Sequence, residues 1–414
     1  MRALHAWMEE NPVGIFFENS DGSVSFEYDR SAPAGPVSLS LPRDGGWSRR
    51  APSLLLDNLL PDSANARRAM MRAVGAKDMD AFTLLDGADS SGGLVFSLND
   101  EYPDPSERVP RARDDDIAAR ISAMRESPDS WWDHDSRIRY SLAGNQPKLS
   151  LARVGGVWTW PNAGNPSTHI LKPSVTATAD AELIEAADMR LAGLAGLPAP
   201  NAGVMEFSGE RTYITERFDR KRLADGRVSR IHMEDLVQSL GIGPEDKYKV
   251  SAGQVLRLLH GTDESDALSY SWLKRLALNT SIGNADAHAK NYSVMLAASG
   301  LSMSPMYDVL TTTYWDWVDP SLPMKIGGAR YAQQITASHW AKLARANALD
   351  EERVVAIARE TAGAVLAHAD EAYHDLPADM RDKLMERLKD ANRHINPIVP
   401  QGTDAEASAS ATAI

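Results

Sequence analysis

Residues 284–291 read N-A-D-A-H-A-K-N and are the stretch on which the interpretation of this sequence depends. The apolar run Leu273–Ile282, which has the character of a helix, precedes them, and a strand-like Y-S-V-M-L follows. The pattern predicts a tight polar loop between a helix and a strand. One interpretation of the loop is structural, because polar side chains in a turn that ends a helix satisfy nearby backbone groups.

A second interpretation of the same loop is phosphoryl transfer. Asp286 and Asn291 have the spacing of the aspartate that accepts the substrate proton and the asparagine that binds a metal ion in protein kinases. A zinc or two-metal hydrolase built on His288 has little support, because the chain has no H-E-x-x-H motif, no clustered second histidine and no cysteine. A serine hydrolase has none, since G-x-S-x-G does not occur.

The composition excludes several other classes of protein. The chain has 414 residues, 43% hydrophobic and 24% charged, which is typical of a soluble globular protein with two or three domains. No apolar run approaches the ~20 residues that span a bilayer, and the N-terminus does not resemble a signal peptide. The absence of cysteine fits a cytoplasmic protein. A net charge of −13 disfavours broad electrostatic capture of nucleic acid.

The order of patterns along the chain predicts an α+β protein with two lobes. Apolar runs at 13–17, 24–28 and 37–41 predict antiparallel strands. The segments expected are an N-terminal α+β subdomain (1–100), a connector and helix (101–129), a β-rich small lobe (130–224), an all-helical C-terminal lobe (225–398) and a disordered tail (399–414). Helices in the C-terminal lobe are expected at 232–240, 249–260, 266–282, 334–348, 350–370 and 376–394. A nucleotide would lie between the two lobes.

Two elements of the β-rich part could bind phosphate. The stretch S-L-A-G-N-Q-P-K, Ser141–Lys148, places a glycine between strand-like runs, where backbone N–H groups can approach a phosphate, although a simple hairpin turn would look the same. Lys172 ends an apolar strand, and in a kinase-like lobe such a lysine reaches the phosphates and pairs with a helix carboxylate, here Glu185 rather than Glu182. A solvent-exposed lysine is the plain alternative.

Two further stretches complete the set. T-E-R-F-D-R, from Thr215, leaves the β-rich part and could present backbone groups to an adenine with Phe218 packing nearby, or its acids could simply pair with local basic residues. Asp308 follows the loop, and a second carboxylate in that order is what a Mg²⁺ site for nucleotide phosphates needs. Each signal is weak by itself, but all five occur in the order that a kinase requires.

The sequence resembles the HipA family of serine/threonine kinases, the toxins of bacterial toxin–antitoxin pairs. The resemblance rests on S-L-A-G-N-Q-P-K, S-T-H-I-L-K-P, T-E-R-F-D-R, R-I-H-M-E-D-L-V-Q-S-L-G, G-N-A-D-A-H-A-K-N and M-Y-D-V-L. Earlier, D-N-L-L-P-D and D-G-A-D-S-S-G-G-L are similar to that family's N-terminal subdomain. It covers nearly the whole chain except the C-terminal tail, and implies a two-lobed protein-kinase-like fold.

The resemblance also implies roles for individual residues. Asp286 would be the catalytic base, and Asn291 and Asp308 would bind Mg²⁺. Ser141 would be the site of autophosphorylation, which would eject the phosphate loop and switch the enzyme off. The positions implied to contact ATP are Ala143, Gly144, Asn145, Gln146, Pro147, Lys148, Lys172, Glu216, Arg217, Phe218, His288, Lys290, Asn291, Tyr307 and Asp308. Pro147 departs from the family, which more usually has an acidic residue there, and it removes one N–H donor.

The expected function is therefore that of a Mg-ATP-dependent serine/threonine protein kinase. The resemblance suggests a translation-related substrate such as an aminoacyl-tRNA synthetase, a HipB-like helix-turn-helix antitoxin as partner, and contact with operator DNA mainly through that antitoxin. Two alternatives remain open from the sequence. One is a catalytically weak, pseudokinase-like module for assembly with the antitoxin and operator, and the other is a kinase acting on a small molecule.

Overall fold

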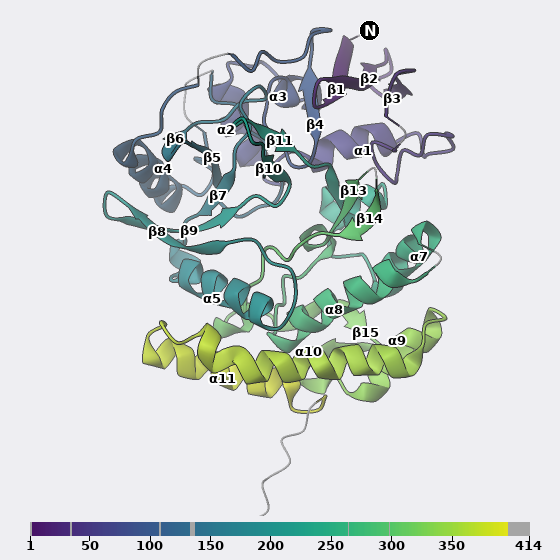
Figure 1. The fold of residues 1–414 in the computed structure, drawn as a ribbon, viewed down its shortest axis with the longest axis vertical. Coiled ribbons are helices and arrows are strands. Elements are labelled where there is room, and N and C mark those ends of the chain that lie inside the picture. The colour runs from purple at the N-terminus through teal and green to yellow at the C-terminus, as the bar shows by residue number, and fades with distance from the viewer. Residues whose placement is uncertain are drawn as a thin grey trace, which may run out of the picture.

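The structure is a computed structural model, and its described residues are 2–33, 35–106, 109–132, 137–263, 265–297 and 299–395. The tail predicted to be disordered, 399–414, lies outside them. Figure 1 shows the strands mainly in the upper part of the molecule and the longest helices at the bottom. Among the described residues, none of the helices combines the length and the apolar character needed to cross a membrane.

A four-stranded antiparallel sheet with the order β3-β2-β1-β4 begins the chain. Its strands are β1 (Arg2–Met8), β2 (Asn11–Glu18), β3 (Val24–Tyr28) and β4 (Leu94–Ser97). The runs at 13–17 and 24–28 are strands as predicted. The run at 37–41 is not, because it forms only an isolated bridge between Ser38 and Leu41. Strand β1 was not predicted from the sequence.

Three helices complete this N-terminal unit and bring its 57–62 segment toward the rest of the protein. They are α1 (Ala51–Asn58), α2 (Ala64–Ala73) and α3 (Ala81–Leu85). Helix α1 carries Pro52 in its first turn, where the missing N–H is not needed, and Pro61 follows soon after its end. The side chains of Ser63 and Asp80 cap α2 and α3. The tight spacing of α1 and α2 makes 57–62 a short, well-defined connection.

The small lobe is built on a five-stranded antiparallel sheet with the order β6-β5-β7-β9-β8. Its elements are α4 (Asp114–Glu126), β5 (Leu149–Val154), β6 (Val157–Thr159), β7 (His169–Lys172), η1 (Thr176–Thr178), α5 (Ala181–Leu194), β8 (Ala202–Phe207) and β9 (Glu210–Glu216). Strand β7 pairs with β9 so that Lys172 lies opposite Tyr213 and His169 opposite Glu216. Helix α5 packs below β8 and β9 (Figure 1).

The C-terminal lobe is mainly helical, but the prediction that it is all-helical is wrong. Its helices are α6 (Leu236–Ser239), η2 (Pro244–Asp246), α7 (Ala252–Thr262), α8 (Ala267–Ser281), η3 (Ala289–Asn291), η4 (Thr312–Tyr314), η5 (Ala332–Gln334), α9 (Ala337–Ala346), α10 (Glu351–Ala372) and α11 (Ala378–Asn392). The paired strands β10 (Arg220–Arg222) and β11 (Val228–Arg230) lie where the small lobe meets the C-terminal lobe. The strands of the C-terminal lobe after them are β12 (Met233–Asp235), β13 (Ser293–Ala297), β14 (Gly300–Met303), β15 (Ser321–Ile326) and β16 (Ala329–Tyr331). The helix expected at 232–240 is a strand followed by the short α6. Strands β12, β13 and β14 form one sheet that flanks the 284–291 loop.

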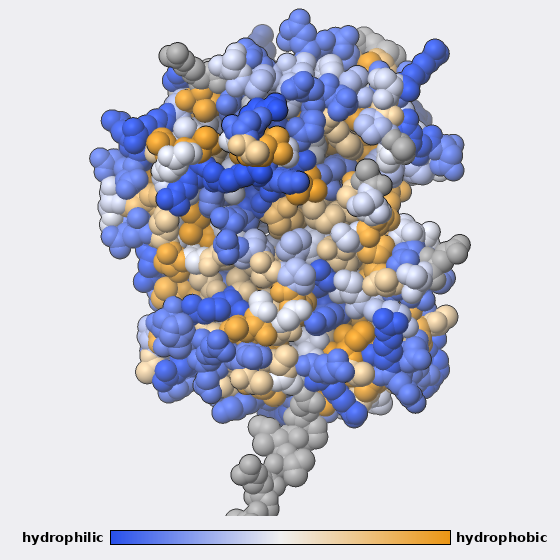
Figure 2. Space-filling model, in the orientation of Figure 1, coloured by the Kyte–Doolittle hydropathy of each residue, from blue (hydrophilic) through white to orange (hydrophobic). Residues whose placement is uncertain are grey.

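The buried apolar side chains show how the parts are joined. One cluster contains Leu4 and Leu56 of the N-terminal unit together with Leu171 of the small lobe. A second fills the C-terminal lobe, and a third packs α5 of the small lobe, through Ile184, against residues such as Val365 of α10. Figure 2 shows apolar side chains across the middle of one face, between more hydrophilic upper and lower parts. The N-terminal unit and the small lobe thus share a continuous core.

Candidate active site

A cavity of about 1330 Å³ lies where the N-terminal unit, the small lobe and the C-terminal lobe meet. It is lined by the 57–67 segment, the phosphate loop at 141–148, β7, α5 and the 215–219 segment at the end of β9. The loop at 284–291, called the catalytic-type loop below, and residues 307–319 complete the lining. All but one of the predicted nucleotide-contacting residues line this cavity, the exception being Pro147. Segments far apart in the sequence therefore form one site.

The phosphate loop, residues 141–148, is held closed by its own lysine. The Lys148 ammonium donates a hydrogen bond to the Ala143 carbonyl across the loop, at 2.8 Å. Gly144 has a φ of +100°, and a Cβ at that position would lie 2.8 Å from the Lys148 nitrogen, so the turn needs glycine. Asn145 is exposed at the tip, Gln146 is half-buried and Pro147 is buried. Burial and the nearby charge of Lys172 lower the pKa of Lys148 to about 8.

The N-terminal unit holds the phosphate loop from the other side. The Asp62 N–H donates to the Gly144 carbonyl at 3.0 Å, and the Ser141 hydroxyl donates to the Leu59 carbonyl at 2.7 Å. Ser141 is fully buried in this arrangement. Residues 57–62, D-N-L-L-P-D, were recognised in the sequence only by their similarity to the family's N-terminal subdomain. Their contact with the phosphate loop was not predicted.

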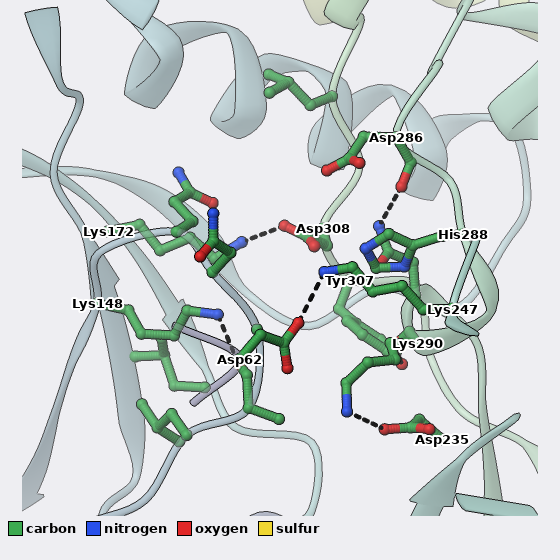
Figure 3. Close-up of a pocket in the computed structure, with 18 of the residues that line it drawn as sticks. Asp62, Lys148, Lys172, Asp235, Lys247, Asp286, His288, Lys290, Tyr307 and Asp308 are labelled. Atoms are coloured by element: carbon green, nitrogen blue, oxygen red, sulfur yellow. Dashed lines mark hydrogen bonds and ion pairs between the residues drawn. The ribbon is translucent and has the colours of Figure 1, made fainter. Parts of the chain in front are cut away.

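Lys172 lies between two carboxylates, as Figure 3 shows for Asp308. Its ammonium is 2.6 Å from the nearest oxygen of Glu185 and 2.6 Å from that of Asp308. The predicted pair with Glu185 is therefore present. Burial alone would lower the pKa of Lys172, but the two carboxylates outweigh it and raise that pKa well above its usual value. Burial raises the pKa of Asp308 in turn, and the lysines outweigh it and hold that pKa well below its usual range.

The loop at 284–291 is fixed by hydrogen bonds within itself. The Asp286 N–H donates to the Asn284 side-chain oxygen at 3.0 Å, and the Asn291 side-chain nitrogen donates to the Asp286 carbonyl at 3.1 Å. Asn284 in turn donates to the Asn279 side chain in α8 at 3.0 Å. The Asp286 carboxylate faces the cavity, and burial raises its pKa above the usual value.

His288 is a neutral side chain within this site. Burial, followed by the charge of Lys247, lowers its pKa to about 3. Its Nδ1 is buried without a hydrogen-bond partner, and its ring meets the Tyr248 ring edge to face at 4.8 Å. Within the described part of the chain no three His, Asp or Glu side chains are grouped as a metal cluster.

The segment after β9 only partly fits its predicted role. Phe218 lies beside Tyr307, with ring centroids 5.5 Å apart, and both rings line the cavity. The N–H groups of Glu216 and Arg217 already donate to the carbonyls of Asn201 and Thr168. The Arg217 guanidinium is held in a buried ion-pair cluster with Asp89 and Asp219. The sequence predicted contact with the adenine through the backbone of this segment, and that contact stays a prediction.

Lys290 lines the cavity, but its ammonium is engaged by other parts of the protein. Its ammonium is buried and donates to the Asn58 carbonyl and to the Asn58 side-chain oxygen at 3.1 and 2.9 Å. The Asp235 carboxylate lies 3.3 Å away on the same side (Figure 3). Lys290 thus joins the loop at 284–291 to Asn58 of α1 and to Asp235 of β12, and its contact with ATP stays a prediction.

Asp62, Lys247 and Tyr248 line the cavity and were missed by sequence reasoning. The Lys247 ammonium donates to the Asp62 carboxylate at 2.7 Å, and the Tyr248 hydroxyl donates to the Asp286 carboxylate. The only sequence signal for Asp62 was its place in D-N-L-L-P-D. Nothing in the local pattern around K-Y-K distinguished Tyr248.

Comparison with known proteins agrees with this geometry. Residues 4–97 match the HipA N-terminal domain, and residues 140–369 match the HipA-like C-terminal domain. A candidate kinase of Sinorhizobium fredii, Y4mE, is 32% identical over 364 residues, which cover 83% of this chain and 86% of that protein. The serine/threonine-protein kinase toxin HipA of Shewanella oneidensis is 28% identical over 338 residues, covering 76% of this chain and 77% of that protein.

A solved structure has the same fold over most of the chain. It is the complex of HipA, HipB and operator DNA from the Shewanella oneidensis toxin–antitoxin system, and it matches with a TM-score of 0.81 at 24% identity. The match covers 95% of this chain and 98% of the solved chain. The two-lobed kinase-like fold predicted from the sequence is thereby confirmed. With both family domains matched in order and the Sinorhizobium relative aligned over most of its length, the chain belongs to the HipA family.

Proposed function

We propose that this protein is a Mg-ATP-dependent serine/threonine protein kinase that acts as the toxin of a toxin–antitoxin pair. The observation that carries the proposal is the convergence of Lys172, Glu185, Asp308 and Asp286 in one cavity with the phosphate loop. Phosphoryl transfer needs charge neutralisation at the phosphates and a base at the acceptor hydroxyl, and these side chains supply both.

The proposed chemistry assigns each side chain a separate task. Lys172, kept charged by Glu185 and Asp308, would neutralise negative charge on the phosphates, with the loop at 141–148 covering them. Asp286 would accept the proton of the acceptor hydroxyl. The oxygen of that hydroxyl would bond to the γ-phosphorus while the bond from the phosphorus to ADP breaks. His288, being neutral, would leave the field of the lysines unchanged.

The residues proposed to bind Mg²⁺ fit that ion. Asp308 is an ionised carboxylate, and the Asn291 amide uses its nitrogen for the Asp286 carbonyl, which leaves its oxygen as the donor. Mg²⁺ prefers one or two protein oxygen ligands together with water and phosphate oxygens. When bound, the ion would supply positive charge at the phosphate oxygens.

The proposed acceptor is a serine or threonine of a translation-related protein, with an aminoacyl-tRNA synthetase as the expected class, and the result would be growth arrest. The proposed partner is a HipB-like helix-turn-helix antitoxin, and operator DNA would be contacted mainly through it. The antitoxin and the DNA are proposed because the similar Shewanella structure is a complex of HipA, HipB and operator DNA. The net charge of −13 agrees with indirect contact to DNA.

Replacement of Asp308 by asparagine tests the proposal. Asparagine tolerates the φ of +56° at this position, so the change removes charge with little backbone strain. We expect wild-type protein incubated with Mg-ATP to gain phosphate, or to transfer it to a co-purified protein, and the variant to do so at least about 10²-fold more slowly. Intact-mass spectrometry and radiolabelled ATP measure both.

The control for Asp308 is Asp370→Asn, an exposed position on α10 that should transfer at the wild-type rate. Absence of phosphate transfer by wild-type protein, to itself and to every protein of a cell extract, would overturn the kinase proposal. Transfer confined to small metabolites, with no labelled protein, would instead identify a small-molecule kinase.

Autophosphorylation of Ser141 is a second part of the proposal. The Ser141 hydroxyl is buried against the Leu59 carbonyl and its N–H donates to the Asp89 carbonyl, so a phosphate of roughly −2 charge cannot fit there. The loop must leave this position when modified. We expect Ser141→Asp to lower phosphate transfer to other proteins about 10²-fold, because a displaced loop no longer covers the phosphates. Ser141→Ala should stay active but accept no phosphate at this site. Phosphopeptide mapping with loop proteolysis decides, and full activity of Ser141→Asp would contradict the mechanism.

A further inference from the structure

The segment from Gly243 to Val250 crosses the acceptor side of the cavity and places a tyrosine on the catalytic carboxylate. The Tyr248 hydroxyl donates its hydrogen bond to Oδ1 of Asp286. The rest of the side chain is half exposed, at 50%. One oxygen of the carboxylate that would take the acceptor's proton is therefore already occupied by a hydroxyl from the protein itself.

This segment is anchored at the residue before the tyrosine. The Lys247 carbonyl accepts a hydrogen bond from the Ala289 N–H, within the loop at 284–291, at 3.3 Å. The Lys247 ammonium donates to Asp62 of the N-terminal unit at 2.7 Å, visible in the centre of Figure 3. The Tyr248 ring touches His288 only with an edge. The backbone is fixed, while the tyrosine side chain has open space on one side.

Two roles are compatible with a hydroxyl in this place. A permanent strut would orient the carboxylate in every state, whereas a gate would occupy the acceptor position only until the acceptor arrives. The backbone of Asp286 does not depend on Tyr248 for its position, because Asn284 and Asn291 already bind its N–H and its carbonyl. The exposure of the tyrosine also leaves room for its side chain to move away. Both observations favour the gate.

We propose that Tyr248 is an acceptor-site gate: its hydroxyl takes the place of the substrate hydroxyl at Asp286 in the free protein and is displaced by the protein acceptor. The inference rests on the proposed kinase function. It identifies a positioning and specificity-determining residue, because an acceptor must both reach Asp286 and displace a phenol. A protein acceptor brings further contacts that offset the loss of the tyrosine hydrogen bond. A water molecule brings none, and so it displaces the Tyr248 hydroxyl poorly.

The gate suppresses a side reaction whose chemistry is defined. If water reaches Asp286, a proton of the water passes to the carboxylate and the water oxygen bonds to the γ-phosphorus. The bond from that phosphorus to ADP breaks, which yields phosphate and ADP. With Tyr248 in place, Oδ1 of the carboxylate is engaged by the phenol, and this hydrogen bond makes Asp286 a weaker base for water. Burial, followed by the charge of Asp286, raises the pKa of Tyr248 well above its usual value, so the hydroxyl stays a donor.

Tyr248→Phe removes the hydroxyl and keeps the ring. We expect acceptor-free hydrolysis of Mg-ATP to rise about ten-fold, as the base becomes accessible to water. With dephosphorylated casein as a probe acceptor, KM should fall while kcat stays within about two-fold, since no transition-state contact is lost. Tyr270→Phe is the matched control, because it loses a hydroxyl that accepts from the Asp350 N–H far from the cavity. Its hydrolysis and casein kinetics should equal those of the wild type.

A measurement that needs no turnover examines the contact itself. In protein labelled with fluorotyrosine, the fluorine resonance missing from Tyr248→Phe belongs to Tyr248. It should shift when Asp286 is replaced by asparagine and remain unchanged in Tyr270→Phe. An unshifted resonance overturns the gate. The gate is also overturned if Tyr248→Phe lowers kcat without raising ATP hydrolysis, because that result means that the tyrosine permanently orients the carboxylate. If wild-type protein transfers phosphate to protein but Tyr248→Phe hydrolyses no faster, the gate alone fails; if no variant turns over ATP, both proposals fail.

Discussion

Asp286→Asn is expected to lower phosphoryl transfer roughly 10³-fold, the effect of removing a general base. Asparagine has the same shape and can still accept the Tyr248 hydrogen bond, but it cannot take the acceptor's proton. The backbone contacts with Asn284 and Asn291 do not involve the carboxylate, so the loop should keep its conformation. Nucleotide affinity, measured by calorimetry with Mg-ADP, should therefore stay within about two-fold of the wild type.

The pH dependence of the reaction gives a second readout for Asp286. Burial raises the pKa of its carboxylate, so the acid limb of the rate profile should lie at higher pH than an ordinary aspartate gives. A base must be deprotonated, and the rate therefore falls as the pH decreases through that raised pKa. The residual rate of Asp286→Asn should lack this limb. Retention of more than a tenth of the activity with an unchanged pH profile would show that another group is the base.

Residues with a fixed order along the chain could be found from the sequence. Lys172, Asp286, Asn291 and Asp308 each follow a recognisable strand or loop, and phosphoryl transfer requires these side-chain types in that order. The pairing of Lys172 with Glu185 followed because the helix after the strand offered only two glutamates, Glu182 and Glu185. The partners of other charged side chains could not be found in this way. Lys290 and Arg217 lie in recognisable motifs, but the sequence does not show that Lys290 binds Asn58 or that Arg217 pairs with Asp89.

The residues that were missed are the ones brought in by long-range contacts. Asp62 reaches Gly144 and Lys247 across 82 and 185 positions of sequence, as their numbering shows. Tyr248 lies on a short turn without any local motif. The strand at 293–297 was predicted from Y-S-V-M-L, but other C-terminal strands, such as 300–303 and 321–326, were missed because such short runs also fit loops or buried helix segments. Only the folded chain shows that 293–297 pairs with 233–235.

A buried ion-pair cluster provides the largest expected effect on stability. The Asp89 carboxylate, in the N-terminal unit, lies 3.2 Å from Arg217, 2.9 Å from Arg220 and 3.2 Å from Arg230. It also accepts the Ser167 hydroxyl hydrogen bond at 2.6 Å. Burial would raise the pKa of Asp89, but the three guanidinium groups outweigh it and lower that pKa. The cluster joins the N-terminal unit to the segment after β9.

Asp89→Asn should destabilise the protein by about 3–5 kcal/mol, because it leaves buried arginines without their shared counter-charge. The depressed pKa of Asp89 means that its contribution is complete above the pKa of the unfolded chain and is lost as the pH falls through the folded value. The difference between variant and wild type should therefore be largest near neutral pH and shrink in acid. Urea unfolding followed by circular dichroism at several pH values measures it.

Asp225→Asn is the control that separates burial from charge. Asp225 also pairs with an arginine, Arg227 at 2.7 Å, but both side chains are exposed on a turn, so solvent screens the pair. We expect this variant to unfold at nearly the same urea concentration as the wild type. If Asp89→Asn unfolds there too, the three arginines are satisfied without Asp89 and the cluster does not hold the N-terminal unit against the kinase lobes. If both variants are equally destabilised, the effect comes from net charge, and the contact between Asp89 and Arg217 is not its cause.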